Sequence, residues 1–239
     1  MPVQGKMPTL EVDRLPAVPN PQGGLTLLPV ARARMAEIAA NSRELGRQGD
    51  AAEWTSRFGA LPHDSIVLAG TVEGELAVFT VLRIVNDEAT LKQVLRPEGD
   101  LGAALAGLHM PWSFPVAVTV WMEVSPSFHF QWNLAFRQVI TQHMLRVASA
   151  HGCTAHAMRT EDQGHPQELV SAIGYHLFPA EPDSSAEPEQ VQVAWLHNGP
   201  GDEFRRLASQ LVRRADRGEL PRSQWRGDPR YEAGGTPTE

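Results

Sequence analysis

The chain has 239 residues, of which 42% are hydrophobic and 21% are charged, and it contains one cysteine. This length and apolar fraction suffice for one packed domain and exclude a wholly disordered polyelectrolyte. The lone Cys153 excludes an intrachain disulfide and a zinc site built from several cysteines. No apolar run is long enough to cross a membrane, and the first residues lack the layout of a signal peptide, so we expect a soluble, cytoplasmic protein.

The net charge of −7 is concentrated in the middle of the chain. Residues 25–201 hold 11 basic and 19 acidic side chains, whereas the two terminal segments are nearly neutral. Such an acidic body is a poor electrostatic match for a nucleic-acid backbone, so we expect no nucleic-acid partner. A group of arginines in the C-terminal segment is most simply a solvated helix face. Its members are Arg205, Arg206, Arg213, Arg214 and Arg217.

The first 24 residues differ in composition from the segment that follows them. Residues 1–24 hold five prolines and a Gly-Gly pair, which is typical of an extended or disordered arm. The next part of the chain predicts a strand, two helices, a β-hairpin, a third helix, and a loop or short Ala-rich helix. These elements are expected at 25–28, 30–45, 50–58, 65–82, 88–95 and 99–111.

The second half of the chain begins with its strongest predicted strand, at 115–124. This run is almost continuously apolar, as expected for a central strand covered on both faces. A helix, a strand, a helix, two strands and a last amphipathic helix are expected to follow. They are placed at 134–150, 154–160, 166–174, 175–178, 191–196 and from Asp202 onward. The strand at 191–196 is expected to close the sheet of a mixed α/β sandwich, and the residues after Pro221 are expected to form a tail.

The segment 115–178 resembles the GNAT superfamily of acyl-CoA-dependent N-acyltransferases. The resemblance is carried by residues 118–126, 137–153 and 169–175. In that family a strand ending near a proline leads through a phosphate-binding turn into a helix closed by Gly-Cys. A "leucine-tyrosine-x-x-leucine-glycine-phenylalanine" element comes later in the family. The resemblance implies a mostly antiparallel, GNAT-like central sheet with helices on both faces.

The domain boundaries follow from the extent of this resemblance. The acyltransferase-like domain is expected over residues 25–197, behind the proline-rich arm at 1–24. Residues 198–239 are expected to form an appended C-terminal amphipathic helix and a flexible tail. An Arg-rich amphipathic helix added to a sheet domain is suited to docking a partner or closing a homodimer.

The chain departs from the family at the phosphate-binding turn. Glycines in that turn let backbone N–H groups approach a pyrophosphate, whereas this chain has no glycine between Pro126 and Gly152. Counting back from Gly152 places the equivalent turn at 132–137, within the segment 131–137 that is expected to be the donor-phosphate site. The resemblance implies that this turn, including Phe136 and the Arg137 guanidinium, holds the phosphate of the donor.

Two further family positions fall later in the chain. An asparagine that often contacts the cofactor arm aligns with Gln163, which keeps the amide group on a longer side chain. The tyrosine that often protonates the departing thiolate falls at Val170. The resemblance therefore implies a cofactor contact at Gln163 and no tyrosine acid at the usual position.

A partial resemblance to the acyl-homoserine-lactone synthases concerns the acyl donor. These enzymes share the fold, take acyl groups from acyl carrier protein and lack a strict glycine signature. Leu82-Arg83-Ile84 is similar to their "arginine-leucine" pair, and residues 121–125 are similar to "tryptophan-glutamate-x-serine-arginine" with one insertion. Of their paired aspartates, only Asp64 stands nearby. The donor is therefore either acyl-CoA or an acylated carrier protein.

Glu123 is the candidate catalytic base. N-acyl transfer needs a neutral amine, a polarised thioester carbonyl and a released thiolate, and a carboxylate near the end of the central strand is suited to removing the amine proton. The alternative is a structural glutamate paired with Arg83 or Arg159 across the sheet. The resemblance also implies that the central strand separates from its neighbour, so that backbone groups of Met122 and Val124 pair with the pantetheine amides of the donor.

Two functions are compatible with these patterns. The first is a divergent N-acyltransferase that moves an acyl group from a thioester carrier to a small amine. The second is a catalytically degenerate copy of the fold that serves as a binding or regulatory module, which the missing glycines, Val170 and the added helix favour. The spacing of the nine histidines matches no metal-binding pattern, so neither function is expected to involve a metal.

Overall fold

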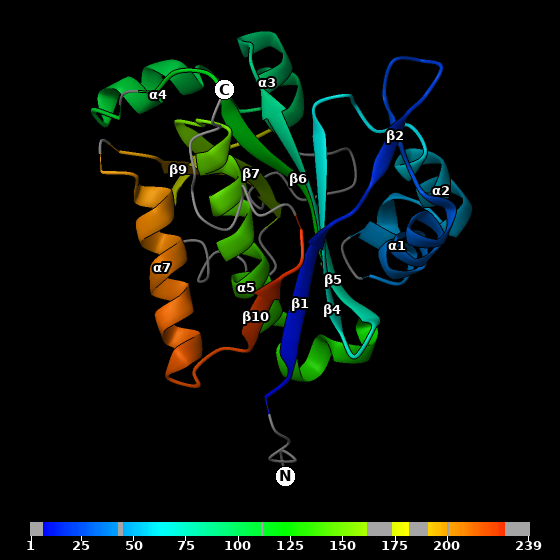
Figure 1. The fold of residues 1–239 in the computed structure, drawn as a ribbon. Coiled ribbons are helices and arrows are strands. Elements are labelled where there is room, and N and C mark those ends of the chain that lie inside the picture. The colour runs from blue at the N-terminus through cyan, green and yellow to red at the C-terminus, as the bar shows by residue number, and fades with distance from the viewer. Residues whose placement is uncertain are drawn as a thin grey trace, which may run out of the picture.

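An eight-stranded sheet forms the centre of the protein (Figure 1). The computed structural model describes residues 7–42, 45–110, 112–161, 174–181, 191–199 and 201–227. The strand order is β10-β1-β4-β5-β6-β7-β9-β8, and its pairs are antiparallel except β1/β10 and β6/β7. The strands of this sheet are β1 (Thr9–Arg14), β4 (Ser65–Val72), β5 (Glu75–Val85), β6 (Val116–Val124), β7 (Ala155–Glu161), β8 (His176–Pro179), β9 (Val191–His197) and β10 (Arg222–Trp225). A small second sheet pairs β2 (Ala17–Pro19) with β3 (Leu25–Leu27).

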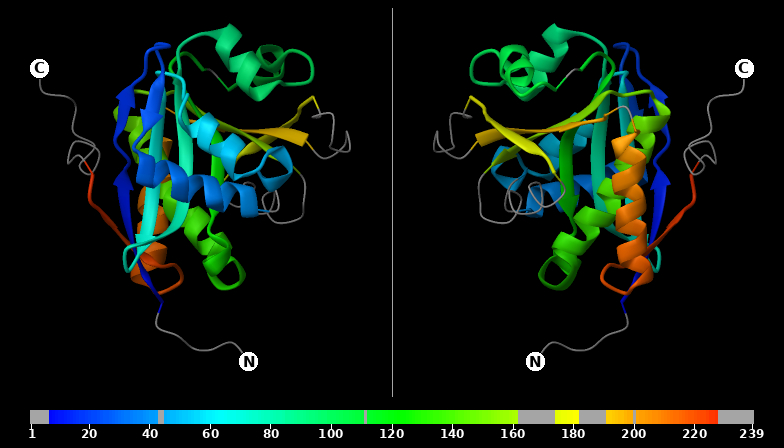
Figure 2. Two further views of the ribbon diagram at one scale, coloured as in Figure 1. Left: turned by 90° about the vertical axis from the view of Figure 1, so that its right-hand side faces the viewer. Right: turned by 90° about the vertical axis from the view of Figure 1, so that its left-hand side faces the viewer.

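Helices cover both faces of the sheet (Figures 1 and 2). One face carries α1 (Pro29–Asn41), α2 (Ala51–Phe58), α3 (Glu88–Leu95) and α4 (Leu101–Gly107). The other face carries α5 (His129–Ala150) and α7 (Glu203–Asp216), and the short helices η1 (Leu45–Gln48) and η2 (Pro126–Phe128) precede α2 and α5. The expected fold class, a mixed α/β protein with a mostly antiparallel sheet between two helical layers, is confirmed. None of the helices in the described ranges combines the length and apolarity that a membrane crossing requires.

Local sequence signals account for several element boundaries. Asp50 caps α2 by accepting from the backbone N–H groups of Ala52 and Glu53, and the Glu53 side chain completes a capping box. The β4–β5 hairpin turns at Glu73 and Gly74, which both have positive φ, a conformation that glycine adopts without strain. These boundaries lie close to those expected from the sequence.

The proline-rich arm expected at residues 1–24 is wrong for much of that segment. Strand β1 pairs with β4, and its side chains Leu10 and Val12 are completely buried. The alternation of apolar and polar residues over 9–14 is a strand signal, and the prolines at positions 8 and 16 lie outside the paired stretch. The fold therefore begins well before residue 25.

Part of the segment expected to be a C-terminal tail is instead a strand. Residues 222–225 form β10, which pairs in parallel with residues 9–12 of β1 at the edge of the sheet. Trp225 is only 8% exposed, and its ring stacks on His143 of α5 at 5.5 Å and 15°. Because α7 and β10 pack on the same core as α5, the segment after residue 197 belongs to the domain.

The apolar face of α7 is used inside the chain. Phe204, Ala208, Leu211 and Ala215 are buried in the core formed with α5, so this face is not available to close a homodimer. Arg205, Arg206 and Arg213 are exposed, whereas Arg214 is half-buried and donates to the Gln138 side chain of α5 at 3.0 Å. Several arginines in and after α7 pair with neighbouring acids. These ion pairs are Arg205–Asp202, Arg206–Glu203, Arg214–Glu219 and Arg217–Glu219. Apart from Arg214, the arginine group is therefore a solvated helix face.

One further expectation is wrong, and another concerns residues outside the described ranges. Strand β9 does not close the sheet, because it lies between β7 and β8, and β8 forms the edge. The sequence could not indicate this order, since β8 and β9 are both short strands near the end of the domain. The helix expected at 166–174 lies almost entirely outside the described residues.

Replacement of Trp225 tests whether the C-terminal strand is part of the fold. We expect Trp225→Ala to lower the free energy of unfolding by about 3 kcal/mol, because it removes a large buried ring and its contact with His143. Val30→Ala, at a position 85% exposed, is the matched control and should change it by less than about 0.5 kcal/mol. Urea unfolding measures both, and equal stability of the two variants would contradict the placement of β10.

Candidate functional site

The candidate site lies where two neighbouring parallel strands separate. Strand β6 pairs with β7 through residues 116–119, opposite 155–158. Beyond this point β6 continues along β5 to Val124, while β7 continues along β9 to Glu161. The separation implied by the family resemblance is therefore present, and residues 120–124 border a gap in the sheet.

A β-bulge at Val120 determines which side chains meet at this gap. Val81 pairs with Trp121 and Leu82 pairs with Thr119, so Val120 is an extra residue in β6. Before the bulge, Thr119 faces α5, with its hydroxyl 3.4 Å from the sulfur of Met144.

Beyond the bulge the alternation of side chains is reversed. Trp121 faces α2, where its ring contacts Trp54 at 5.2 Å and Phe58 at 5.6 Å. Glu123 pairs with Phe79, which belongs to the same α1/α2 core. Because one extra residue moves every following side chain to the opposite face, the bulge puts Glu123 on the α1/α2 side.

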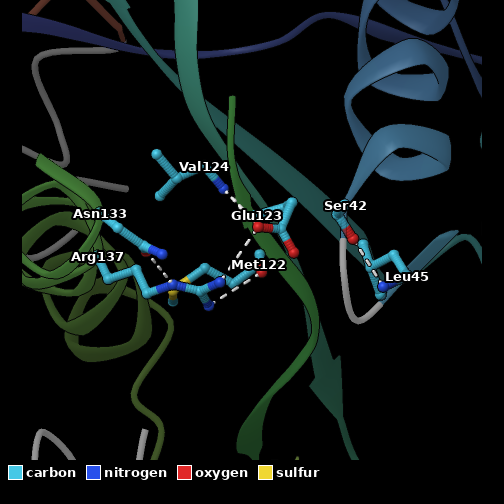
Figure 3. A network of polar contacts seen from close by, with 7 residues as sticks. All are labelled: Ser42, Leu45, Met122, Glu123, Val124, Asn133 and Arg137. Atoms are coloured by element: carbon cyan, nitrogen blue, oxygen red, sulfur yellow. Dashed lines mark hydrogen bonds and ion pairs between the residues drawn. The ribbon is translucent and has the colours of Figure 1, made fainter. Parts of the chain in front are cut away.

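Glu123 and Arg137 form a nearly buried ion pair at the gap (Figure 3). Their side chains are 3% and 14% exposed, and one carboxylate oxygen of Glu123 accepts from the Arg137 guanidinium at 3.2 Å. The same oxygen accepts from the backbone N–H of Val124 at 3.1 Å. Arg137 also donates to the Met122 carbonyl at 3.2 Å and to the Asn133 side chain at 2.7 Å. The gap-facing Met122 carbonyl and Val124 amide are thus bonded to side chains of this chain.

The segment 131–137 is helical and does not form the expected turn. No glycine or proline interrupts residues 127–151, so α5 extends back to His129, and the N–H groups of 133–137 bond to carbonyls one turn earlier in the helix. Phe136, expected to contribute to the phosphate site, is completely buried and packs on Phe128 at 5.7 Å and on Trp132 at 6.3 Å. It is a core residue of α5.

Four of the other expected site residues lie together at the gap, and one lies outside the described residues. Glu123, Met122, Val124 and Arg137 meet at the gap, although the sequence suggested separate roles for Glu123 and Arg137. Gln163 lies outside the described residues, as does position 170.

The two alternative partners of Glu123 are engaged elsewhere. Arg83 forms two bonds to the carboxylate of Asp64, at 2.9 and 3.0 Å, and both side chains are largely buried. Arg159 donates to the backbone carbonyl of Glu181. The cationic partner that the structure gives to Glu123 is Arg137, which lies on a helix on the other side of the gap.

A buried polar chain that the sequence did not indicate lies at the base of the fork. The imidazole of His156 contacts the Thr119 hydroxyl at 2.8 Å through Nε2 and the Tyr175 hydroxyl at 2.5 Å through Nδ1. Since Thr119 donates to the sulfur of Met144, its oxygen accepts from Nε2–H, and Tyr175 donates to Nδ1. Burial lowers the pKa of His156 to about 3 and raises the pKa of Tyr175, so both groups are neutral.

A separate cavity lies far from this gap. It has a volume of about 650 Å³ and is lined by residues that include Arg14, Ser65, Ile84 and His151. Ile84 lies five residues along β5 from Phe79, the residue paired with Glu123, so the cavity is toward the opposite end of the strand. Across the described ranges, no three His, Cys, Asp or Glu side chains gather around a common point where a metal would bind.

The buried histidines predict a specific pH dependence of stability. Burial lowers the pKa of His143 to about 3, as for His156, with a further contribution from nearby Arg146. Below pH 6.5 these two histidines bind protons in the unfolded chain but not in the folded chain. The free energy of unfolding therefore falls toward pH 3 by about 1.4 kcal/mol per pH unit for each histidine. Above pH 6.5 these two groups contribute no pH dependence.

Removal of one buried histidine tests this linkage. We expect His143→Gln to reduce the slope of unfolding free energy against pH by about 1.4 kcal/mol per unit between pH 6 and 5. Urea unfolding at several pH values measures the slope, with His63→Gln at an exposed position as the control for loss of a histidine. An identical slope in His143→Gln and the parent chain would show that His143 takes up a proton in the folded state.

Comparisons with known proteins concern the fold of the whole domain. The sequence matches no protein-family model, and no curated protein matches it significantly. The structure is similar to a CoA-dependent acyl-homoserine lactone synthase, BjaI, solved with SAM and isopentyl-CoA. The TM-score is 0.52 at 13% identity, over 92% of this chain and 94% of that chain. It is also similar to the C-terminal condensation domain of Ebony in complex with beta-alanyl-dopamine, with a TM-score of 0.52 at 14% identity, over 80% of this chain and 100% of that one. An aminoglycoside 6'-acetyltransferase type Ii gives a TM-score of 0.49 at 13% identity, over 72% and 92% of the two chains. The forked, mostly antiparallel sheet and the similarities to BjaI and to the Ebony domain together show that this chain has a GNAT-like fold.

Proposed function

We propose that this protein is an N-acyltransferase that moves an acyl group from a thioester donor to a small amine. The observation that carries the proposal is the fork between β6 and β7, with a bulge that presents the Glu123 carboxylate beside the gap. The thioester arm of the donor lies in the gap, along residues 120–124. The amine approaches from the α1/α2 face, where Trp121 forms part of an aromatic wall with Trp54 and Phe58.

Glu123 acts as the base in this proposal. An amine is mostly protonated near neutral pH, and the carboxylate removes one proton directly or through a water molecule. The neutral amine then attacks the thioester carbonyl, the C–N bond forms, and the C–S bond breaks as the tetrahedral intermediate collapses. The sulfur leaves as a thiolate, which is an acceptable leaving group because an ordinary thiol has a pKa of about 8.5.

The donor is acyl-CoA or an acylated carrier protein. The similarity to BjaI supports acyl-CoA, since that structure was solved with isopentyl-CoA. The helical segment at 132–137 supports a donor held mainly through its pantetheine arm, because it leaves no glycine turn for a pyrophosphate. No metal takes part in the proposed reaction.

One observation favours a second candidate function. The Met122 carbonyl and the Val124 amide, which would pair with the donor, are bonded to Arg137 and Glu123. A fork closed in this way is compatible with a binding or regulatory module that has the fold without the transferase activity.

Calorimetry with three donors tests the proposed donor site. Acetyl-CoA, a long-chain acyl-CoA and an acylated carrier protein are each titrated into the folded protein. We expect at least one of them to bind. Absence of binding by all three, with a normal unfolding transition, would reject the donor site and favour the regulatory module.

A conservative substitution tests the role of Glu123. Once a donor and an amine are found, we expect Glu123→Gln to lower turnover by about 10²- to 10⁴-fold, because the amide cannot accept the proton. Glu75→Gln, at an exposed glutamate paired with Arg34, is the control and should keep normal turnover. Retained turnover in Glu123→Gln would remove this residue from the mechanism.

A further inference from the structure

Arg137 forms hydrogen bonds to two groups with proposed roles in the reaction: the Met122 carbonyl, for the donor, and the Glu123 carboxylate, for the amine. One of its guanidinium N–H groups bonds to the Met122 carbonyl, where a donor amide would pair, and another bonds to the carboxylate of Glu123 (Figure 3). Asn133, one turn earlier in α5, holds the guanidinium at Nε. A single side chain therefore connects the donor side of the gap to the candidate base.

This arrangement keeps the carboxylate of Glu123 occupied. A guanidinium N–H at 3.2 Å, in a nearly buried setting, bonds to the same carboxylate oxygen that accepts from Val124. The same guanidinium competes with any donor N–H for the Met122 carbonyl. Donor binding in the gap and release of Glu123 from Arg137 are thus linked by direct competition for the same side chain.

We propose that Arg137 is a positioning residue that makes the base dependent on the donor. In the donor-free chain it holds Glu123 and closes the gap. A pantetheine amide that pairs with the Met122 carbonyl displaces the guanidinium, and Glu123 then becomes available to the amine, so the donor binds first. This inference rests on the proposed transferase function and concerns the order in which its site is assembled.

The movement that this requires is small. Arg137 lies on a helix fixed by the buried Phe136, so the helix stays in place and only the long side chain changes conformation. The guanidinium exchanges its bonds in the gap for bonds to water, since its side chain is 14% exposed. The donor in turn supplies an N–H to the Met122 carbonyl, and the Glu123 oxygen that loses the guanidinium keeps its bond from the Val124 N–H.

Donor affinity of an arginine variant distinguishes this positioning role from direct phosphate binding. The probe is S-acetyl pantetheine, which has the thioester and amides but no phosphate, titrated by calorimetry into the parent chain and Arg137→Gln. We expect Arg137→Gln to bind it about fivefold more tightly, because the competing guanidinium is absent. Acetyl-CoA should show the same direction of change. The control is Arg34→Gln, at an exposed arginine of α1, with unchanged affinity.

Removal of Arg137 alone leaves the buried Glu123 charge without its cationic partner, which is destabilising, so the test is repeated in a chain that lacks this charge. Glu123→Gln is compared with the double variant Glu123→Gln/Arg137→Gln, in which the site contains neither charge. The double variant should again bind the probe more tightly. Equal or weaker binding after removal of Arg137, in both backgrounds, would overturn the proposal. If neither probe binds to the parent chain or to any variant, and a long-chain acyl-CoA and an acylated carrier protein also fail to bind, the proposed transferase function itself is rejected.

A comparison of KM with kcat supplies a readout that a purely structural arginine would not change. Removal of Arg137 removes the competitor for the Met122 carbonyl, so KM for the donor should fall while kcat is retained. A merely destabilised variant would lose kcat without a fall in KM. An unchanged or higher KM for the donor would contradict the proposed competition.

Discussion

The β-bulge at Val120 is the constraint on which the candidate site depends. Without the extra residue, the alternation of β6 would point Glu123 toward α5 and leave Trp121 away from the aromatic wall of α2. The bulge also coincides with the last residues that pair β6 with β7, so the reversal of faces and the opening of the sheet occur together. A carboxylate from the α1/α2 side and a guanidinium from the α5 side then meet in the gap.

The uninterrupted helix α5 explains both what this site lacks and what it gains. Its 22 residues continue through the segment where the family resemblance implies a glycine turn, so the backbone N–H groups of 133–137 are used within the helix. In exchange, residues one turn apart, Asn133 and Arg137, are aligned at the edge of the gap. In the proposed function, a donor is therefore recognised through its thioester arm rather than its phosphates, and Arg137 is the side chain that it displaces.

The sequence predicted elements with a strong local period and missed contacts between distant segments. The β4–β5 hairpin, strand β6 and helix α3 follow from local patterns and lie close to their expected positions. Strand β10 was missed because its partner, β1, lies more than 200 residues earlier in the chain. Its four residues, three polar ones and a tryptophan, do not predict a strand by themselves. The bulge was missed because residues 115–124 are almost uniformly apolar, so the sequence has no alternation of polar and apolar residues that an extra residue would interrupt.

The candidate site residues at 122–124 were located by the family resemblance. The pairing of Glu123 with Arg137, and of His156 with Tyr175, depends on tertiary structure.

The most direct measurement of the central claim is the response of backbone amide resonances to acetyl-CoA in the folded protein. The account predicts that the largest shifts fall on residues 120–124 of β6 and on the facing end of β7, with a change in the side-chain Nε–H resonance of Arg137. Shifts confined to the distant cavity near Ser65, Ile84 and His151, with β6 unaffected, would contradict it.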